Sequence, residues 1–395
     1  MSTKLFSTFT LRDVVLKNRI VAAPMWQYAG KNWLPNDWHL MNLGRLADGG
    51  AGLVFQEGTT VERRGCGTLG DIGLWSDDSI PLYKRIVALV ESCGAVPGVQ
   101  LMHAGRKARQ KPPVQGRGAL EQSADIPDWD QWDVIAPSAI AQAPGFPVPR
   151  EMTLHDVQQV IEAFTSAARR AHDIGYKVLQ LHAAHGYLLH EFLSPVSNRR
   201  TDAYGGDFES RARLLLEVVE SIRTVWPHGK PIVVRLSCID GEAGGWSIED
   251  TFTLVRLLKA RGVDMIDCSS GGIDGSPLTK GLAASYGYQS ELAAAVRKET
   301  GIPTSAVGLI VHANQAERIL VEGKSDVVAL ARELIYNPNW PMDAARKLGD
   351  EKSFNVMQRR GAFWLERRSV TVPDLVPSTF PDPFAPVGSG AETSS

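Results

Sequence analysis

Cysteine is scarce in this 395-residue chain, which contains only four. None of them forms a Cys-x-x-Cys pair, and they lie far apart, at Cys66, Cys93, Cys238 and Cys268. Closely spaced thiolates are what a zinc ribbon or an iron–sulfur cluster needs, and dense pairing is what a disulfide framework needs. The cysteine pattern therefore argues against all three.

Net charge and long apolar runs are also lacking. The 42 Lys and Arg residues nearly balance 44 Asp and Glu, and the formal charge of −2 argues against nucleic acid or a membrane surface as the main partner. No stretch reaches the roughly 18 apolar residues that a spanning helix needs. The first residues, MSTKLFSTFTLR, lack the apolar centre of a signal peptide. We therefore expect a cytoplasmic protein.

Short, continuously apolar runs recur along the chain. Such runs are typical of parallel strands that are covered on both faces, whereas half-exposed strands alternate. Eight of them are predicted to be strands, at residues 18–24, 51–57, 96–103, 176–181, 231–237, 265–270, 303–308 and 326–332. Helical patterns lie between them, at residues 153–175, 209–226, 247–262, 290–300 and 314–322.

Strands and helices that alternate in this way predict a single (β/α)₈ TIM barrel, with a doubly wound sheet as the less regular alternative. A short N-terminal segment precedes the barrel. Residues 106–149 form a long insertion after the third strand, and a loop of that length is more often a lid or binding loop than a simple connection. We expect the barrel domain at residues 1–368 and a flexible Pro-, Ser- and Gly-rich tail at residues 369–395.

Two imidazoles and a phenol follow the fourth predicted strand, which is expected to stop at His182. His185 and Tyr187 come within five residues of it. In a TIM barrel the carboxyl ends of the strands carry the functional groups, so these side chains are expected to share one space. The simpler interpretation is that they are ordinary polar groups at a strand end. A metal site is disfavoured, because neighbouring strand ends hold Pro24, Gln100 and Arg235 rather than further ligands.

The last strands of the barrel carry the elements of a phosphate site. Glycines let backbone N–H groups approach an anion, and an arginine adds a bidentate hydrogen-bond donor. Candidates are Gly271, Gly272, Gly308 and Arg332, although the glycines could serve only to make tight turns. Gln100 suits the edge of a heterocycle, and Arg235 suits a ring that becomes anionic. A phosphate-bearing ring of this kind describes reduced FMN.

The segment Gly65-Cys66-Gly67-Thr68-Leu69-Gly70 matches the G-x-G-x-x-G pattern of dinucleotide sites. It neither follows a strand directly nor opens a helix, and no acidic residue follows in a βαβ unit. We therefore do not interpret it as a dinucleotide site.

Longer motifs give the chain a family resemblance. From Leu5 to Arg368 it is similar to the Old Yellow Enzyme family of FMN-dependent ene-reductases, in the thermophilic-like bacterial subgroup. The motifs that carry the resemblance are APM at 23–25, GVQLMHAGRK at 98–107, HAAHGYLLHEFLSP at 182–195, NRRTDAYGG at 198–206, VGLI at 307–310 and AREL at 331–334.

The resemblance implies which residues bind FMN. Residues near the flavin ring would be Ala23, Pro24, Met25, Trp26, Gly58, Gln100 and Arg235. Residues at the phosphate would be Gly308, Ala331 and Arg332. NADPH or NADH would be the reductant, and no metal is implied.

The resemblance also implies which residues act on the substrate. His182 and His185 would hold the carbonyl or nitro oxygen, Tyr187 would donate a proton, and Tyr28 and Trp26 would contact the substrate. An arginine near the C-terminus reaches the neighbouring subunit's site in this subgroup. Arg360 fits that role, with Arg359 as the alternative, so a homodimer or homotetramer is implied.

The sequence departs from the subgroup at three positions. Trp26 stands where the first strand usually ends in Pro-Met-Cys, and an indole is bulkier than a thiol and cannot become a thiolate. Ala331 replaces a glycine, and Ser210 replaces an asparagine. The Trp26 change leaves the substrate range open, whereas the FMN site would use the backbone there.

The function implied is ping-pong reduction of the activated C=C bond of α,β-unsaturated carbonyl compounds, with hydride from flavin N5 and a proton from Tyr187. Two alternatives remain. The same fold could reduce nitro compounds or an aromatic or heteroaromatic ring, because Trp26 could stack on a flat substrate. The chain could also be a flavin-binding module without ene turnover, if Trp26 fills the substrate space.

Overall fold

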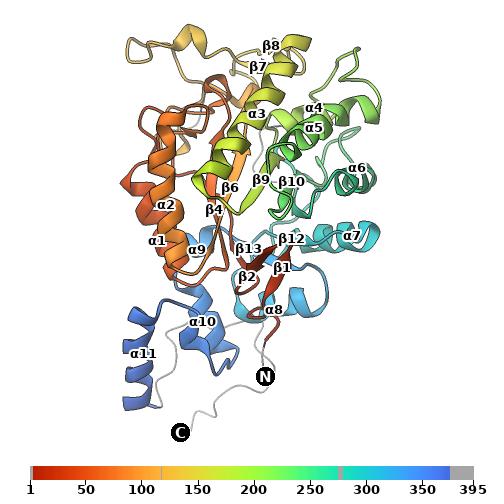
Figure 1. Ribbon diagram of the computed structural model, residues 1–395. Coiled ribbons are helices and arrows are strands. Elements are labelled where there is room, and N and C mark those ends of the chain that lie inside the picture. Colours follow the sequence, from red (N-terminus) through yellow and green to blue (C-terminus); the bar gives the residue numbers. More distant parts are fainter. Residues whose placement is uncertain (1–2, 117, 275–278, 374–395) are drawn as a thin grey trace.

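The computed structural model describes residues 3–373, apart from residues 117 and 275–278. Within that part, a ring of eight parallel strands is surrounded by helices (Figure 1). The ring consists of β3 (Ile20–Ala22), β4 (Leu53–Thr60), β6 (Val96–Met102), β9 (Val178–Ala183), β10 (Ile232–Ser237), β11 (Met265–Ser269), β12 (Thr304–Ala306) and β13 (Val327–Leu330). Pairing of β13 with β3, and of β3 with β4, closes it. The predicted (β/α)₈ barrel is confirmed.

All eight predicted strands are present, with ends that differ by a few residues. The most consequential difference is at β9, which runs through Ala183 rather than stopping before His182. The extra length follows from pairing, because Ala183 is in register with Leu236 of β10, and His182 with Arg235. His182 is therefore a strand residue at the mouth of the barrel.

The helices between the strands begin and end at capping residues. The helix α3 (Leu154–Ile174) begins with a capping box between Thr153 and Asp156, and it ends at Gly175, whose φ is +113°. The same box opens α6 (Ile248–Ala260). The other helices that were predicted are α5 (Phe208–Arg223), which ends three residues early, α7 (Ser290–Thr300) and α8 (Ala313–Val321).

Further helices were not predicted, because their start signals are unusual. The helix α1 (Asp37–Asp48) is capped by Asn36 and His39 rather than by a Ser/Thr and an acid, and α2 (Ile80–Ser92) begins without a side-chain cap. The short helices are α4 (Leu188–Leu193) and α9 (Arg332–Tyr336), and the chain continues into α10 (Trp340–Lys347) and α11 (Arg359–Thr371).

The barrel is closed at one end and open at the other. A hairpin of β1 (Phe9–Leu11) and β2 (Val14–Leu16) covers the end where the strands begin, and its Leu11 and Leu16 pack against buried strand residues. At the other end lie the carboxyl ends of the strands, where a TIM barrel carries its functional groups.

The predicted insertion after the third strand is an irregular segment at the opposite end of the molecule from the hairpin (Figure 1). Its β7 (Ile135–Ala136) pairs with β8 (Arg150–Glu151) just before α3, and β5 (Ile72–Gly73) extends the sheet beside β4. Of the tail predicted at 369–395, residues up to Thr371 continue α11, and residues 374–395 lie outside the described part. Among the described helices, none combines the length and apolar character needed to cross a membrane.

Candidate active site

The rings of His182, His185 and Tyr187 meet at the carboxyl end of β9. The centroid of His182 lies 5.1 Å from that of His185 and 4.9 Å from that of Tyr187. The indole of Trp26 completes the group, with its centroid 5.1 Å from Tyr187 and 6.2 Å from His182. The prediction that these side chains share one space is therefore confirmed.

The loop that follows β9 is held in an uncommon conformation. His185 has φ of +58°, in the left-handed region that residues other than glycine rarely adopt. Its N–H donates to Ser237 Oγ at 3.0 Å, and its carbonyl accepts from Lys107 Nζ at 2.6 Å. Its Nε2 lies 2.6 Å from Ser269 Oγ, which leaves Nδ1 as the ring nitrogen for an external partner. Tyr187 then precedes the first turn of α4.

Burial sets the protonation of all three groups. It lowers the pKa of His182 and of His185 well below the usual value, and the positive charge of Arg235 adds to the effect. It raises the pKa of Tyr187 well above the usual value, with Tyr28 and Asp71 contributing. Both imidazoles are therefore neutral and the phenol keeps its proton near pH 7.

A line of polar side chains crosses the barrel mouth beside this cluster. Gln100 Nε2 donates to Gln180 Oε1 at 2.6 Å, and Gln180 Nε2 donates to Asp267 Oδ2 at 3.2 Å. Arg235 Nε lies 3.4 Å from the same oxygen but makes no hydrogen bond to any described residue. The buried Nδ1 of His182 also lacks a partner in the described part of the chain. Buried donors without partners mark a place where a ligand is expected.

A cavity of about 390 Å³ opens beside β12 and β13. Arg235 and His185 line one side, and Gly308, Ala331 and Arg332 line the other. Gly308 has φ of +109°, and a Cβ there would lie 2.7 Å from Gln289 Nε2, so the backbone approach needs glycine. Ala331, which stands in place of a glycine, has φ of −114° and ψ of −94°, outside the main helical and extended regions.

A second cavity of about 320 Å³ lies on the other side of the ring cluster. Trp26, Tyr28 and Tyr187 line it, together with Lys107 and Asp71, which were not predicted as site residues. Both could have been found from the sequence, because Lys107 ends the GVQLMHAGRK motif and Asp71 directly follows the G-x-G-x-x-G segment. Burial lowers the pKa of Lys107 to about 8 and raises that of Asp71 to about 6.

Trp26 fills the space beside the second strand. Its Nε1 donates to the Gly58 carbonyl at 2.9 Å, and a Cβ on Gly58 would lie 2.7 Å from the indole. The usual cysteine could not reach this carbonyl. The indole is thus fixed as a wall of the 320 Å³ cavity rather than as a loose plug.

The remaining predicted residues are not all gathered at the cavities. Ala23 is buried and donates its N–H to the Leu330 carbonyl at 2.9 Å, and Pro24 and Met25 continue from it toward Trp26. Arg360 is exposed on α11 and lines neither cavity of its own chain, and the same holds for Arg359. Among the described residues, no group of three or more His, Cys, Asp and Glu is arranged to hold a metal ion.

Comparison with known proteins decides the family. The model of the NADH:flavin oxidoreductase / NADH oxidase family matches residues 4–351. The chain belongs to this family. An NADPH dehydrogenase of Geobacillus thermodenitrificans is 41% identical over 363 residues, which cover 91% of this chain and 99% of that protein.

Solved structures agree with the assignment. The Old Yellow Enzyme homologue of Zymomonas mobilis has a TM-score of 0.73 at 25% identity, covering 87% of this chain and 93% of that one. A 2-naphthoyl-CoA reductase complex has a TM-score of 0.77 at 25% identity, covering 90% of this chain, which spans only 53% of that protein. This Old Yellow Enzyme family member is therefore an FMN-dependent NAD(P)H oxidoreductase.

Proposed function

We propose that this oxidoreductase reduces the activated C=C bond of α,β-unsaturated carbonyl compounds. The observation that carries the proposal is the cluster of two neutral imidazoles and a protonated phenol, with ring centroids 4.9–5.1 Å apart, between the two cavities. Bound FMN supplies the hydride, which it takes from NADPH or NADH. The chain's own residues supply binding, orientation and the proton.

His182 and His185 are proposed to bind the carbonyl oxygen of the substrate. Hydride addition at the β-carbon moves negative charge to this oxygen, and fixed N–H donors stabilise such charge as it develops. The unpartnered Nδ1 of His182 supports the assignment, as does the contact of His185 Nε2 with Ser269, which orients Nδ1 of that ring outward. Neutral donors suit the role because they do not titrate near pH 7.

Tyr187 is proposed to protonate the carbon next to the carbonyl group. Its raised pKa keeps the phenol protonated, and it lines the 320 Å³ cavity, where the substrate would lie. Tyr28 and Trp26 line the same cavity and are proposed to contact the substrate.

FMN is proposed to bind along the polar line and the 390 Å³ cavity. Gln100 and Arg235 would meet the pyrimidine edge, while Ala23, Pro24, Met25, Trp26 and Gly58 would contact the ring through backbone groups. Gly308, Ala331 and Arg332 would hold the phosphate. Arg235 supports this placement, because it lines the 390 Å³ cavity and its Nε, 3.4 Å from Asp267 Oδ2, makes no hydrogen bond to a described residue.

A panel of substrates tests the reaction class. Anaerobic, pre-reduced enzyme is mixed with enones, nitroaromatics and aromatic thioesters, and flavin reoxidation is followed by absorbance. Reoxidation by enones, with a loss of about 10²-fold in His182→Ala, is expected. Reoxidation by oxygen alone would instead identify a flavin-binding module without ene turnover, and a colourless protein that takes up no FMN would contradict the cofactor site.

The second candidate function is reduction of a flat nitro or aromatic substrate. Trp26 favours it, since its indole is a fixed cavity wall with centroids 6.4 Å from Tyr28 and 5.1 Å from Tyr187. The likeness to a structure described as a 2-naphthoyl-CoA reductase also favours it. Trp26→Cys separates the two candidates. Under this second candidate it would weaken binding of aromatic substrates far more than that of small enones.

The assembly is proposed to be a homodimer or homotetramer in which Arg360 reaches the neighbouring site. The helix α11 presents Phe363 and Trp364 with exposed fractions of 40% and 72%, and such exposure of large apolar groups favours a partner surface. Arg360→Ala should lower activity without changing FMN content. Arg359→Ala is the companion variant, and a loss of activity in it instead would assign the role to Arg359. Sedimentation gives the assembly state.

A further inference from the structure

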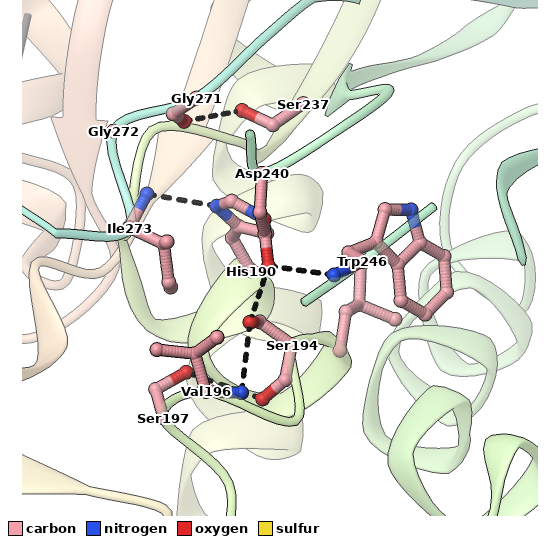
Figure 2. Close-up of polar contacts among 12 residues, drawn as sticks. His190, Ser194, Val196, Ser197, Ser237, Asp240, Trp246, Gly271, Gly272 and Ile273 are labelled. Atoms are coloured by element: carbon pink, nitrogen blue, oxygen red, sulfur yellow. Dashed lines mark hydrogen bonds and ion pairs between the residues drawn. The ribbon is translucent and has the colours of Figure 1, made fainter. Parts of the chain in front are cut away.

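Behind the loop that carries His185 and Tyr187, the fully buried side chains of His190 and Asp240 form a hydrogen-bonded pair. His190 of α4 places Nε2 2.7 Å from Asp240 Oδ1, and both side chains are 0% exposed. The second carboxylate oxygen accepts from Ser194 Oγ at 2.5 Å and from the Trp246 N–H at 2.8 Å. Figure 2 shows His190, Ser194 and Trp246 gathered around the Asp240 carboxylate. Nothing in the proposed reaction uses the pair directly.

The other ring nitrogen of His190 points back to the site loop. Its Nδ1 accepts a hydrogen bond from the N–H of Gly186 at 2.9 Å. A ring nitrogen that accepts cannot carry a proton, so the proton of the neutral ring lies on Nε2 and is donated to Asp240. Burial pushes the pKa of Asp240 upward, but His190, Ser194 and Trp246 together hold it below the usual value. The carboxylate thereby fixes both the tautomer and the rotation of the ring.

Gly186 is the residue between His185 and Tyr187, and its backbone is tightly constrained. Its φ is +71°, and a Cβ there would lie 2.4 Å from the carbonyl oxygen of Gly272. Together with His185 at +58°, it makes two consecutive left-handed residues, a conformation that is strained at residues other than glycine. Contacts must therefore hold the loop in place.

Each polar contact on this short loop comes from a different part of the barrel. Ser237 accepts from the His185 N–H and also donates to the Gly271 carbonyl at 2.8 Å (Figure 2). Lys107 donates to the His185 carbonyl. His190 is the acceptor of the Gly186 N–H, and a buried amide left without an acceptor destabilises the fold.

We propose that His190, oriented by Asp240, is a positioning residue for the reaction. Acting through the Gly186 N–H, it holds the left-handed loop so that the His185 ring and the Tyr187 phenol both reach the substrate. The roles of His185 and Tyr187 rest on the proposed function, whereas the control of the loop by His190 does not.

Two substitutions of His190 test its two ring nitrogens one at a time. In His190→Asn the amide oxygen can stand where Nδ1 stands, which keeps the acceptor for Gly186 and gives up Asp240. In His190→Gln the longer amide reaches toward Asp240 and gives up the acceptor. Thr251→Val is the structural control, because Thr251 is buried and bonds Trp246 Nε1 and the Cys238 carbonyl without contacting His190 or Asp240.

The first measurement is the rate of reoxidation of reduced enzyme by an enone, with FMN content as a check. His190→Gln is expected to slow this step by about 10- to 100-fold at similar FMN content, since small misplacements of reacting groups have effects of that size. His190→Asn and Thr251→Val are expected to stay within about threefold of the unaltered enzyme.

The second measurement is amide hydrogen exchange of the segment 184–189, which needs no turnover. Exchange should be at least about tenfold faster in His190→Gln than in His190→Asn, and unchanged in Thr251→Val. Equal kinetic losses in both His190 variants, in proportion to lost thermal stability, would overturn the proposal, as would unchanged exchange in His190→Gln. If the unaltered enzyme reduces no enone, the proposed function fails, and the exchange result alone then decides the role of His190.

Discussion

Tyr187 shows how the position of a side chain, more than its chemical type, sets its chemistry. A phenol on the surface would exchange its proton freely with water, whereas this one is enclosed by Trp26, His182 and the Lys107 amine, which lies 5.3 Å from the ring centroid. The enclosure raises its pKa, so the phenol keeps its proton at neutral pH, as the proposed role of proton donor requires.

Tyr187→Phe isolates this role, because it removes the hydroxyl and keeps the ring. We expect reoxidation by an enone to fall by about 10²-fold or more, the usual effect of losing a general acid, while flavin reduction by NADPH changes little. Stopped-flow absorbance measures the two half-reactions separately. A variant slowed equally in both would contradict the assignment of Tyr187 as the proton donor.

Glu191 is a buried acid that the proposed reaction does not use. Its Oε1 accepts from the Arg106 N–H at 2.9 Å, while Oε2 has no partner in the described part of the chain. Burial raises its pKa from 4.5 to about 8, an effect that Arg106 and Lys107 only partly oppose. The carboxyl group is therefore protonated in the folded protein at neutral pH.

This shift predicts how stability depends on pH. Between pH 4.5 and about 8 the folded chain holds a proton that the unfolded chain releases, so this group's contribution falls as pH rises, by up to about 1.4 kcal/mol per pH unit. Glu191→Gln, which is neutral at every pH, should flatten that part of the profile. Denaturant unfolding at several pH values measures it, and an unaltered slope would show that Glu191 is ionised in the folded state.

Among the elements, α3 depends strongly on its first turn. Asp156 accepts from Thr153 Oγ1 and N–H and also pairs with Arg64 and Arg150, each at 2.8 Å. These contacts join α3 to the segment after β4 and to β8. Hydrogen bonds from Arg150 hold the pKa of Asp156 far below its usual value despite opposing burial.

Thr153→Ala should lower the free energy of unfolding by about 1 kcal/mol, because the Asp156 N–H loses its cap acceptor. Thermal and denaturant unfolding measure the change. Thr165→Ala, in the same helix but away from its first turn, is the comparison. FMN content should be the same in both, since neither residue lines the cavities.

For the molecule as a whole, the cofactor and the barrel should stabilise each other. FMN bound across the ends of several strands adds stability by mass action, about 2.7 kcal/mol when its free concentration is 100 times Kd. Removing FMN should lower Tm, and adding it back should restore Tm. Arg332→Ala should reduce the gain without affecting the Tm of the apoprotein. If FMN raised Tm equally in the unaltered protein and in Arg332→Ala, the phosphate would have to bind elsewhere.

Much of the fold could be predicted from the sequence, because its signals are local. Continuous apolar runs identify strands covered on both faces, and Thr153 and Ser247 mark helix starts. The helices α1 and α2 were not predicted, because their start signals are uncommon. The end of β9 was misplaced because the register with β10, rather than any local residue pattern, extends it to Ala183.

The site was predicted in its residue types and in its position at the strand ends, since barrel topology brings those ends together. The pKa shifts and the orientations of these side chains depended on contacts between segments that are distant in the sequence. The low pKa of His182 beside Arg235, the indole of Trp26 fixed on Gly58, and the buried His190–Asp240 pair all require packing between residues 32 to 53 positions apart. Periodicity and motifs indicate which side chains face inward, but burial and orientation arise only when the barrel closes, because both depend on neighbours that the local sequence does not supply.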